Sequence, residues 1–363
     1  MDLYIIQRID SYLDYVTQIT MRRVCHLWNK SLPPITIDSE PLAQILTQSC
    51  DHIAKCALIH GCDQLFRHAI KCGFQDWNRG LKWACRGGDL GFIGEVIGHG
   101  VTNWNRGLFG VCRGGHSEVI QSLMDQAPSD WNWDWNGGFS MACRGGHLEL
   151  IQTMIKHGAN DWNWGLNRAC LGGNLAVIQI IIDQGATNWD WGLAGACQGG
   201  NLSVVHKMID LGATDWNAGL VGACWGGHLS LATMMIDRGA TDWDFALRWA
   251  CQGNNHSLVQ KMIEQGATNW NRGLYGACKG GYLDMIQMMI DRGANDWDHG
   301  LFEACLGGHV VVAQRMIDLG ATNWNQGLYG ACVEDHLDLI RMMIKQGATF
   351  CANCRHSPSQ HRI

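Results

Sequence analysis

Apolar residues recur at helical spacing along most of the chain. The unit is clearest over residues 270–296, WNRGLYGACKGGYLDMIQMMIDRGAND. Leu, Ala and Cys stand four, seven and eight places after its Trp, so they share one face of a short helix. Gly-Gly ends that helix, and a second apolar stretch of helical spacing follows until Gly-Ala closes it. Each unit is therefore predicted to form two short helices.

The same unit recurs at a fixed period. Ten Trp residues mark it, and every step between them is 27 residues except one, which holds four extra residues at 131–134 and predicts a bulged loop. These are Trp77, Trp104, Trp135, Trp162, Trp189, Trp216, Trp243, Trp270, Trp297 and Trp324. Such a period is typical of a solenoid, in which each unit buries its apolar face against its neighbours. The recurring Trp and Cys are expected in the core.

The repeat region is predicted to cover residues 41–350. Residues 41–76 are interpreted as a degenerate first repeat, because 60–74 align in register with 87–101 while Cys50 takes the Trp position. Together with the complete units, this predicts about eleven repeats in an all-α fold. Residues 351–363 break the register and form a C-terminal tail. Asn, Asp or His precedes nine of the ten second helices and is expected to cap them, and Tyr282 takes the place in the tenth.

Four positions of the unit vary while its frame stays fixed. They lie two, five, six and nine places after the Trp, on one stripe of the first helix opposite the Leu, Ala and Cys face. Trp and Arg, which are enriched at binding hot spots, occupy many of them. The predicted partner-binding residues of this face are Arg79, Arg106, Trp164, Trp191, Trp225, Phe245, Trp249 and Arg272. The alternative is that some of these Trp side chains pack between units.

Residues 1–40 follow a different pattern, with apolar residues spaced for two short amphipathic helices. The stretch MDLYIIQRIDSYLDYVTQITMRRVCHLWNKSL resembles an F-box, with Met1-Asp2 in place of the motif's leading Leu-Pro. F-boxes dock on the Skp adaptor of cullin-RING ubiquitin ligases, so the resemblance implies a helix-in-groove contact with that adaptor. The residues expected to make it are Ile5, Ile6, Ile9, Leu13, Val24 and Trp28. The alternative is that these helices only cap the solenoid.

The repeat itself resembles the ankyrin family. GHLEL at 146–150, Ala-Cys in place of Ala-Ala, and the closing Gly-Ala after Met-Ile carry the resemblance. Ankyrin units run about 33 residues, and the six missing here fall between units, where ankyrins project a β-hairpin finger. The fingers are therefore predicted to be reduced or absent. The combination resembles short ankyrin repeats of large DNA viruses, several of which pair an F-box with the array. In this family the first helix lines a concave surface where target proteins bind.

Composition and charge exclude several function classes. With a net charge of −6, the chain lacks the basic footprint of a general nucleic-acid binder. The sequence has no run of about 18 apolar residues, so no membrane span is predicted. The start MDLYIIQ lacks the basic residues of a secretion signal. The Cys ladder is expected to be free thiols in a reducing compartment, either the cytosol (the host cytosol if the protein is viral) or the nucleus.

No reaction centre is predicted. The chain has no GxSxG, phosphate-cradling GxxxxGK[ST] or HExxH motif, so neither an enzyme nor a cofactor is expected. The His residues before the second helices stand a full repeat or more apart, too far for a metal site. The tail residues Cys351, Cys354, His356 and His361 come near to zinc spacing, and a frayed terminus is the alternative there.

Two functions fit this sequence. In the first, the chain is a substrate-recruiting adaptor that holds a target protein on the repeat face and an Skp-type adaptor on residues 1–40. In the second, it is a plain ankyrin-type binding module that sequesters a host protein, with the N-terminal helices acting only as a cap.

Overall fold

The computed structural model describes residues 50–334 and 336–349, and the F-box-like segment and the tail lie outside them. Within these ranges the chain forms 22 helices and no strand. The helices make eleven consecutive pairs, as the sequence predicts. The chain divides into two compact units, which we call unit 1 (Met1–Asp161) and unit 2 (Trp162–Ile363). In each pair, the helix that begins at the Trp position is the first helix.

Unit 1 contains four described pairs. Their bounds are α3 (Cys50–His60), α4 (Asp63–Lys71), α5 (Trp77–Gly87), α6 (Leu90–Gly98), α7 (Trp104–Gly114), α8 (Ser117–Gln126), α9 (Trp135–Gly145) and α10 (Leu148–Lys156). The pair α3 and α4 is the degenerate repeat. The four extra residues lie in the loop between α8 and α9, where the rings of Trp133 and Trp135 are 5.6 Å apart.

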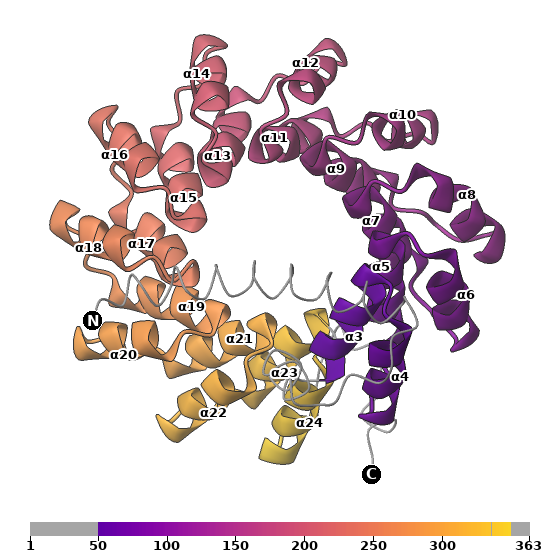
Figure 1. Cartoon of the computed structure of the whole chain (residues 1–363). Helices are drawn as coiled ribbons and strands as arrows, with labels where there is room; N and C mark the ends of the chain where they lie inside the picture. The colour runs from indigo at the N-terminus through magenta and orange to yellow at the C-terminus, as the bar shows by residue number, and fades with distance from the viewer. Residues whose placement is uncertain (1–49, 335, 350–363) are drawn as a thin grey trace, which may run out of the picture. The chain divides into compact units, whose positions relative to one another are not determined.

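Unit 2 contains seven pairs. Their bounds are α11 (Trp162–Gly172), α12 (Leu175–Asp183), α13 (Trp189–Gly199), α14 (Leu202–Asp210), α15 (Trp216–Gly226), α16 (Leu229–Asp237), α17 (Trp243–Gln252), α18 (His256–Gln265), α19 (Trp270–Gly280), α20 (Leu283–Asp291), α21 (Trp297–Gly307), α22 (Val310–Asp318), α23 (Trp324–Val333) and α24 (Leu337–Gln346). Within this unit the odd-numbered first helices form one row and the even-numbered second helices another (Figure 1).

Local polar residues set where each first helix starts and stops. In eight of them the Asp or Asn before the Trp accepts the backbone N–H three places on, as Asp215 does from Ala218 at 2.9 Å, whereas Asn103 makes no such bond. This is the ordinary N-cap bond, which satisfies one of the unpaired amides at the start of a helix. At the other end, Gly227 adopts the left-handed conformation (φ 82°) that a C-cap favours. The predicted Gly-Gly stop is therefore confirmed.

A side-chain clamp replaces the ankyrin hairpin between repeats. The carboxamide oxygen of Asn217 accepts the backbone N–H groups of Thr241 at 2.7 Å and Asp242 at 2.9 Å, in the linker to the next Trp. At the equivalent place Asp190 accepts from Thr214 and Asp215. Because one acceptor satisfies two linker amides, a short linker needs no strand partner. The expected loss of the β-hairpin fingers is confirmed for the described residues.

The frame positions form the core, as predicted. In α15, Leu220, Ala223 and Cys224 are fully buried, and Met235 of α16 packs beneath Gly219. The nine ladder thiols from Cys85 to Cys305 are free and buried. The tenth, Cys332, is disulfide-bonded, which corrects the expectation of a free thiol at that position.

The ladder Trp residues are less buried than predicted. Only Trp104 is buried, and the other nine are half-buried. Each stands at the first position of its helix, and in four repeats the C-cap residue of the second helix lies against its ring. Trp77 stacks on His99 with ring centroids 3.8 Å apart, and the Arg238 guanidinium lies 5.8 Å from the ring centroid of Trp216. The core assignment was wrong because a helix start is at the edge of a layer.

The residue six places after the Trp sets how closely first helices approach. A Cβ on Gly222 would lie 2.2 Å from the carbonyl oxygen of Ala194, and one on Gly276 would lie 1.9 Å from that of Arg248. The backbones of adjacent first helices are thus in direct contact at this glycine. In α17 and α21 a larger residue stands at this position, and these helices pack less closely against the preceding first helix. The prediction that this position is exposed was wrong, because it faces the preceding first helix.

The residues before the second helices do more than cap. Asp89 and Asn174 accept amides of their own helix, as predicted. The His residues make no such bond, and neither do Asn201 and Asn255, which corrects that part of the prediction. His309 instead contacts the carbonyl oxygen of Lys279 in the previous repeat at 3.1 Å, and its ring lies on the left-handed Gly281, where a Cβ would be 2.5 Å from Nδ1. The His therefore joins neighbouring repeats.

Candidate interaction faces

The predicted partner-binding residues fall into both compact units. Arg79 of α5 and Arg106 of α7 belong to unit 1. The other six belong to first helices of unit 2, and we call them the aromatic face. They are Trp164, Trp191, Trp225, Phe245, Trp249 and Arg272.

Four residues of the aromatic face form one cluster on α15, α17 and α19. The rings of Trp225 and Trp249 have centroids 4.7 Å apart, and Phe245 meets Trp249 edge-on at 6.1 Å. The Arg272 guanidinium lies 5.4 Å from the centroid of the Phe245 ring, within cation–π range. Because these rings pack on one another, their apolar surface is held in a fixed arrangement before any partner arrives.

Two Trp residues of this face remain strongly exposed. Trp191 of α13 is 42% exposed and Trp225 is 40% exposed, although frame residues in the same helices are fully buried. The Asn167 side chain donates to the backbone carbonyl of Trp191 at 2.8 Å, which fixes α13 against α11 at this point. Trp164 of α11 is half-buried. Large exposed aromatic side chains on a packed helix row are typical of an interaction surface.

A buried ion pair supports the aromatic face, and the sequence did not reveal it. Arg248 of α17 donates to a carboxylate oxygen of Glu303 on α21 at 2.6 Å, two repeats away. Gly276 of the intervening α19 has no side chain to block this contact. Glu303 is 3% exposed, and its second carboxylate oxygen has no hydrogen-bond partner. His299 lies 3.5 Å from the bound oxygen.

A second row of aromatic rings continues along α19, α21 and α23. Tyr275 packs on His299 at 4.1 Å, His299 on Phe302 at 5.6 Å, and Phe302 stacks on Tyr329 at 6.2 Å. Burial, and then the hydrogen bond to Asp296, raise the pKa of Tyr275, so its hydroxyl stays neutral and donates. Three of the four rings stand five places after a Trp, so listing that position repeat by repeat would have found them.

In unit 1, one of the predicted arginines is already engaged. Arg79 forms ion pairs with Asp51 of α3 at 3.2 Å and with Asp76 at 3.4 Å. Arg106 is half-buried on α7. The structure therefore does not bring Arg79 and Arg106 together with the aromatic cluster as a single patch.

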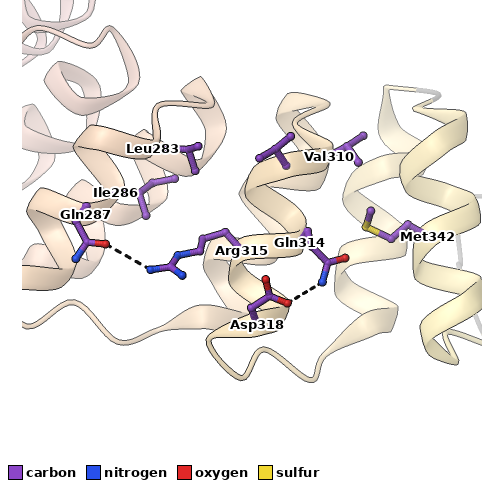
Figure 2. A pocket seen from close by; sticks show the side chains of 9 residues that line it. Leu283, Ile286, Gln287, Val310, Gln314, Arg315, Asp318 and Met342 are labelled. Atoms are coloured by element: carbon purple, nitrogen blue, oxygen red, sulfur yellow. Dashed lines mark hydrogen bonds between the residues drawn. The ribbon is translucent and has the colours of Figure 1, made fainter.

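Another apolar surface lies on the second-helix side of unit 2. A hollow between α20, α22 and α24 is lined by Leu283, Val310, Met342 and their neighbours (Figure 2). Gln287 accepts from Arg315 at 3.4 Å across it. These helices carry none of the predicted face residues.

Metal and membrane chemistry find no support in the part of the chain that the structure describes. It has no group of three or more His, Cys, Asp or Glu side chains placed to hold a metal ion. Among the helices from α3 to α24, none combines the length and the apolar character needed to span a membrane. The zinc alternative concerns the tail, which lies outside the described residues.

Comparison with known proteins gives a limited result. No protein-family model matches the chain, and no curated protein matches it. Solved structures do match, among them the crystal structure of the human ASB11 ankyrin repeat domain. That similarity has a TM-score of 0.30 and 21% sequence identity, and it covers 51% of this chain and 98% of that chain.

Proposed function

We propose that the chain is a non-catalytic interaction scaffold that holds a partner protein on the aromatic face of unit 2. The observation that carries this proposal is the pair of strongly exposed Trp side chains, Trp191 and Trp225, on helices whose frame residues are fully buried. Their exposure costs hydrophobic stabilisation that burial would provide, about 25 cal/mol per Å² of apolar surface. A partner that covers them would recover it.

The composition of the face suits a protein partner. Trp, Phe and Arg are the side chains that most often carry binding energy at protein interfaces, and they do so in central, packed clusters. The cluster around Trp249 has this arrangement, with Arg272 stacked against Phe245 at its margin. Arg248 of the same helix pairs with the buried Glu303, so these two charges are balanced before the partner binds.

The finer proposal is that the chain is an adaptor for a ubiquitin ligase. The F-box-like resemblance of residues 1–40 supports it, and an Skp-type adaptor would be the second partner. By holding a target on the repeats and the ligase at the N-terminal segment, the chain would raise the effective concentration of one near the other. The alternative is a plain binding module that sequesters its partner. The nine free ladder thiols favour a reducing compartment, the cytosol or the nucleus, whereas the bonded Cys332 does not.

A pull-down with purified Skp adaptor separates these two functions. The full chain should retain the adaptor, and the variant carrying Ile9→Asp and Leu13→Asp should lose it, because charges on an apolar anchor prevent docking in a groove. An intact chain that retains no adaptor leaves only the plain binding module.

The aromatic face is tested by affinity capture with the full chain followed by quantitative mass spectrometry. A protein that binds this face should be recovered less with Trp191→Ala and with Phe245→Ala, each by about tenfold or more. Val311→Ala on α22 is the matched control, because Val311 is exposed on the second-helix side. Equal recovery with all these variants would contradict the proposed face.

A further inference from the structure

Three first helices of unit 1 concentrate positive charge. Together α5, α7 and α9 contain six cationic side chains and no acidic one. These are Arg79, Lys82, Arg86, Arg106, Arg113 and Arg144. The whole chain has a net charge of −6, so this concentration runs against the overall composition.

Three of these cations form what we call the basic ladder: Arg86, Arg113 and Arg144. Each stands nine places after the Trp of its repeat, in the last turn of its first helix. Arg113 and Arg144 are exposed and Arg86 is half-buried. Burial, and then the charges of Arg113 and Arg144, lower the pKa of Arg86, while burial and then Arg113 lower the pKa of Arg144. The three guanidinium groups are therefore close enough to repel one another.

Acidic side chains near the ladder in sequence are engaged elsewhere. Asp89 accepts the backbone N–H of Gly91 at 2.8 Å, and Glu149 accepts the hydroxyl of Ser117 at 2.7 Å. No acidic residue between positions 50 and 349, position 335 aside, forms an ion pair with the ladder.

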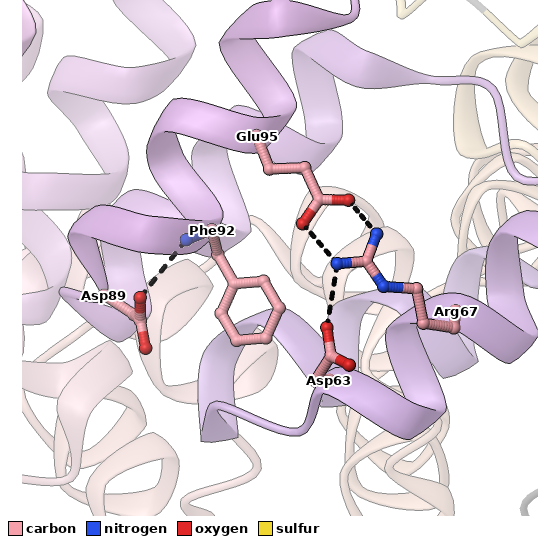
Figure 3. A network of polar contacts seen from close by, with 5 residues as sticks. All are labelled: Asp63, Arg67, Asp89, Phe92 and Glu95. Atoms are coloured by element: carbon pink, nitrogen blue, oxygen red, sulfur yellow. Dashed lines mark hydrogen bonds and ion pairs between the residues drawn. The ribbon is translucent and has the colours of Figure 1, made fainter.

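The second helices of the same unit show the opposite arrangement. Arg67 of α4 is held by Asp63 of its own helix and by Glu95 of α6, with an Nη2–Oε2 distance of 3.0 Å to Glu95 (Figure 3). Unit 1 thus neutralises an exposed arginine on one side and leaves three without an acidic partner on the other.

The helix dipole does not explain the ladder. A cation near a helix C-terminus is favourable, by about 0.3–1 kcal/mol. However, only one of the seven first helices of unit 2 places a cation at this position, Lys279. The other six hold Leu171, Gln198, Trp225, Gln252, Leu306 and Val333. The helices therefore form without a cation there, and the three arginines of unit 1 need another reason.

We propose that the basic ladder binds an extended acidic segment of a partner protein, with a carboxylate on every third residue. Packed helices lie about 8–10 Å apart, and an extended chain advances about 3.3 Å per residue. Three residues of such a segment therefore span about the distance between adjacent first helices. Side chains at i, i+3 and i+6 would each meet one arginine, and carboxylate–guanidinium hydrogen bonds are strong and directional.

A protein segment fits this surface better than a nucleic acid. Phosphates follow one another at about 3.4 Å per strand in a duplex, so every third phosphate would match the ladder too, and the choice between the two rests on charge. The net charge of −6 would also repel a long polyanion beyond the three arginines. A short acidic segment presents its charge only where the ladder is.

The experiment uses the full chain and two labelled peptides of about ten residues. Both contain three Glu in a Gly, Ser and Asn background, placed at every third position in one and consecutively in the other. Fluorescence anisotropy should show tighter binding of the spaced peptide, and Arg113→Gln should weaken it by about tenfold. Arg341→Gln on α24 removes an exposed arginine of unit 2 and is the matched control, which should bind as the unchanged chain does.

Three results would overturn the proposal. Equal affinity for the two peptides would mean that the spacing of the arginines does not select the spacing of the carboxylates. An unchanged affinity of the Arg113→Gln variant for the spaced peptide would place the binding elsewhere. Tighter binding of single-stranded RNA at the same ionic strength would make the surface a nucleic-acid site. The proposal rests on the scaffold function but only on unit 1, so Trp191→Ala should leave peptide binding unchanged. The two surfaces can therefore fail separately.

Discussion

The first helices of the two units share one frame but carry different side chains. In unit 1, α5, α7 and α9 bear six cations and no anion. In unit 2, the seven first helices bear four cations and four anions, together with the aromatic face. One of those anions, Glu303, neutralises Arg248 within the packing.

This difference separates what folds the chain from what varies on it. Leu, Ala and Cys are buried in both units, and the same polar residues cap and clamp the repeats in both. Because each repeat is stabilised by its neighbours through these positions, the remaining ones can differ without loss of the fold. The comparison therefore predicts equal responses to changes in the frame and unequal responses to changes in the faces.

The largest expected effect is the response of the shared core to alkaline pH. Burial raises the pKa of Cys112, Cys197 and Cys224 to about 12, against an ordinary value of about 9. Below pH 9 these thiols are protonated in both folded and unfolded chains. Between pH 9 and 12 the unfolded chain loses these protons and the folded chain keeps them, so stability should fall as pH rises. Circular dichroism of urea unfolding at several pH values measures this.

Thiol labelling provides the control for the alkaline effect. At pH 8, Cys112 of unit 1 and Cys197 of unit 2 should react with iodoacetamide equally slowly, whereas the exposed Cys72 should react fast. Mass spectrometry of the labelled peptides gives the rates. Rapid labelling of one ladder thiol would show that the two units do not share a closed core.

The second effect concerns the contact between first helices. A Cβ on Gly276 of unit 2 would lie 1.9 Å from a backbone oxygen of the preceding first helix. A Cβ on Gly110 of unit 1 would lie 2.3 Å from the equivalent oxygen. Changing either glycine to Ala should cost about 3 kcal/mol through overpacking, measured by urea unfolding. Gly94→Ala is the matched control in open space, where Ala should stabilise the helix by up to about 1 kcal/mol. A large loss of stability for the glycine variant of only one unit would contradict a common packing of first helices in the two units.

The third effect tests the charge balance of unit 2. Glu303→Ala removes the partner of Arg248 and leaves its half-buried guanidinium uncompensated, which should cost about 2 kcal/mol. The exposed Glu264→Ala should change stability by less than about 0.5 kcal/mol. Similar losses in urea unfolding for both variants would mean that the buried pair does not stabilise the face.

A smaller effect is expected at the linker clamp. Asn217→Ala removes the acceptor for the amides of Thr241 and Asp242, and it should cost about 1 kcal/mol. Hydrogen exchange of these two amides should speed up. Asn217→Asp should keep their protection, because the Asp190 carboxylate accepts the equivalent linker amides elsewhere in unit 2. Unchanged exchange in the Ala variant would show that the linker is held by other contacts.

Repeated positions made most of the fold predictable from sequence. The helical spacing of Leu, Ala and Cys gave the helix pairs, and the left-handed glycines gave their ends. Prediction failed where a residue contacts the next repeat: His309 packs on Gly281, and Glu303 lies between first helices. Spacing within one repeat defines the faces of one helix, but it does not show which face the neighbouring repeat covers.

The candidate site was predictable only in part. The aromatic cluster at Trp249 followed from listing large side chains at the varying positions. The Arg248–Glu303 pair joins residues 55 positions apart, and no period of the sequence relates them. The basic ladder appears only when the first helices of unit 1 are separated from those of unit 2.

The most direct measurement compares two double variants of α13 and α15 by urea unfolding. Trp191 and Trp225 are exposed there, whereas Leu193 and Leu220 are fully buried in the same two helices. We predict that Trp191→Ala with Trp225→Ala lowers the free energy of unfolding by about 2 kcal/mol at most, because Trp225 also packs on Trp249, while Leu193→Ala with Leu220→Ala lowers it by about 5 kcal/mol or more. A comparable loss in the tryptophan variant would contradict the account, because those side chains would then hold the repeats together instead of awaiting a partner.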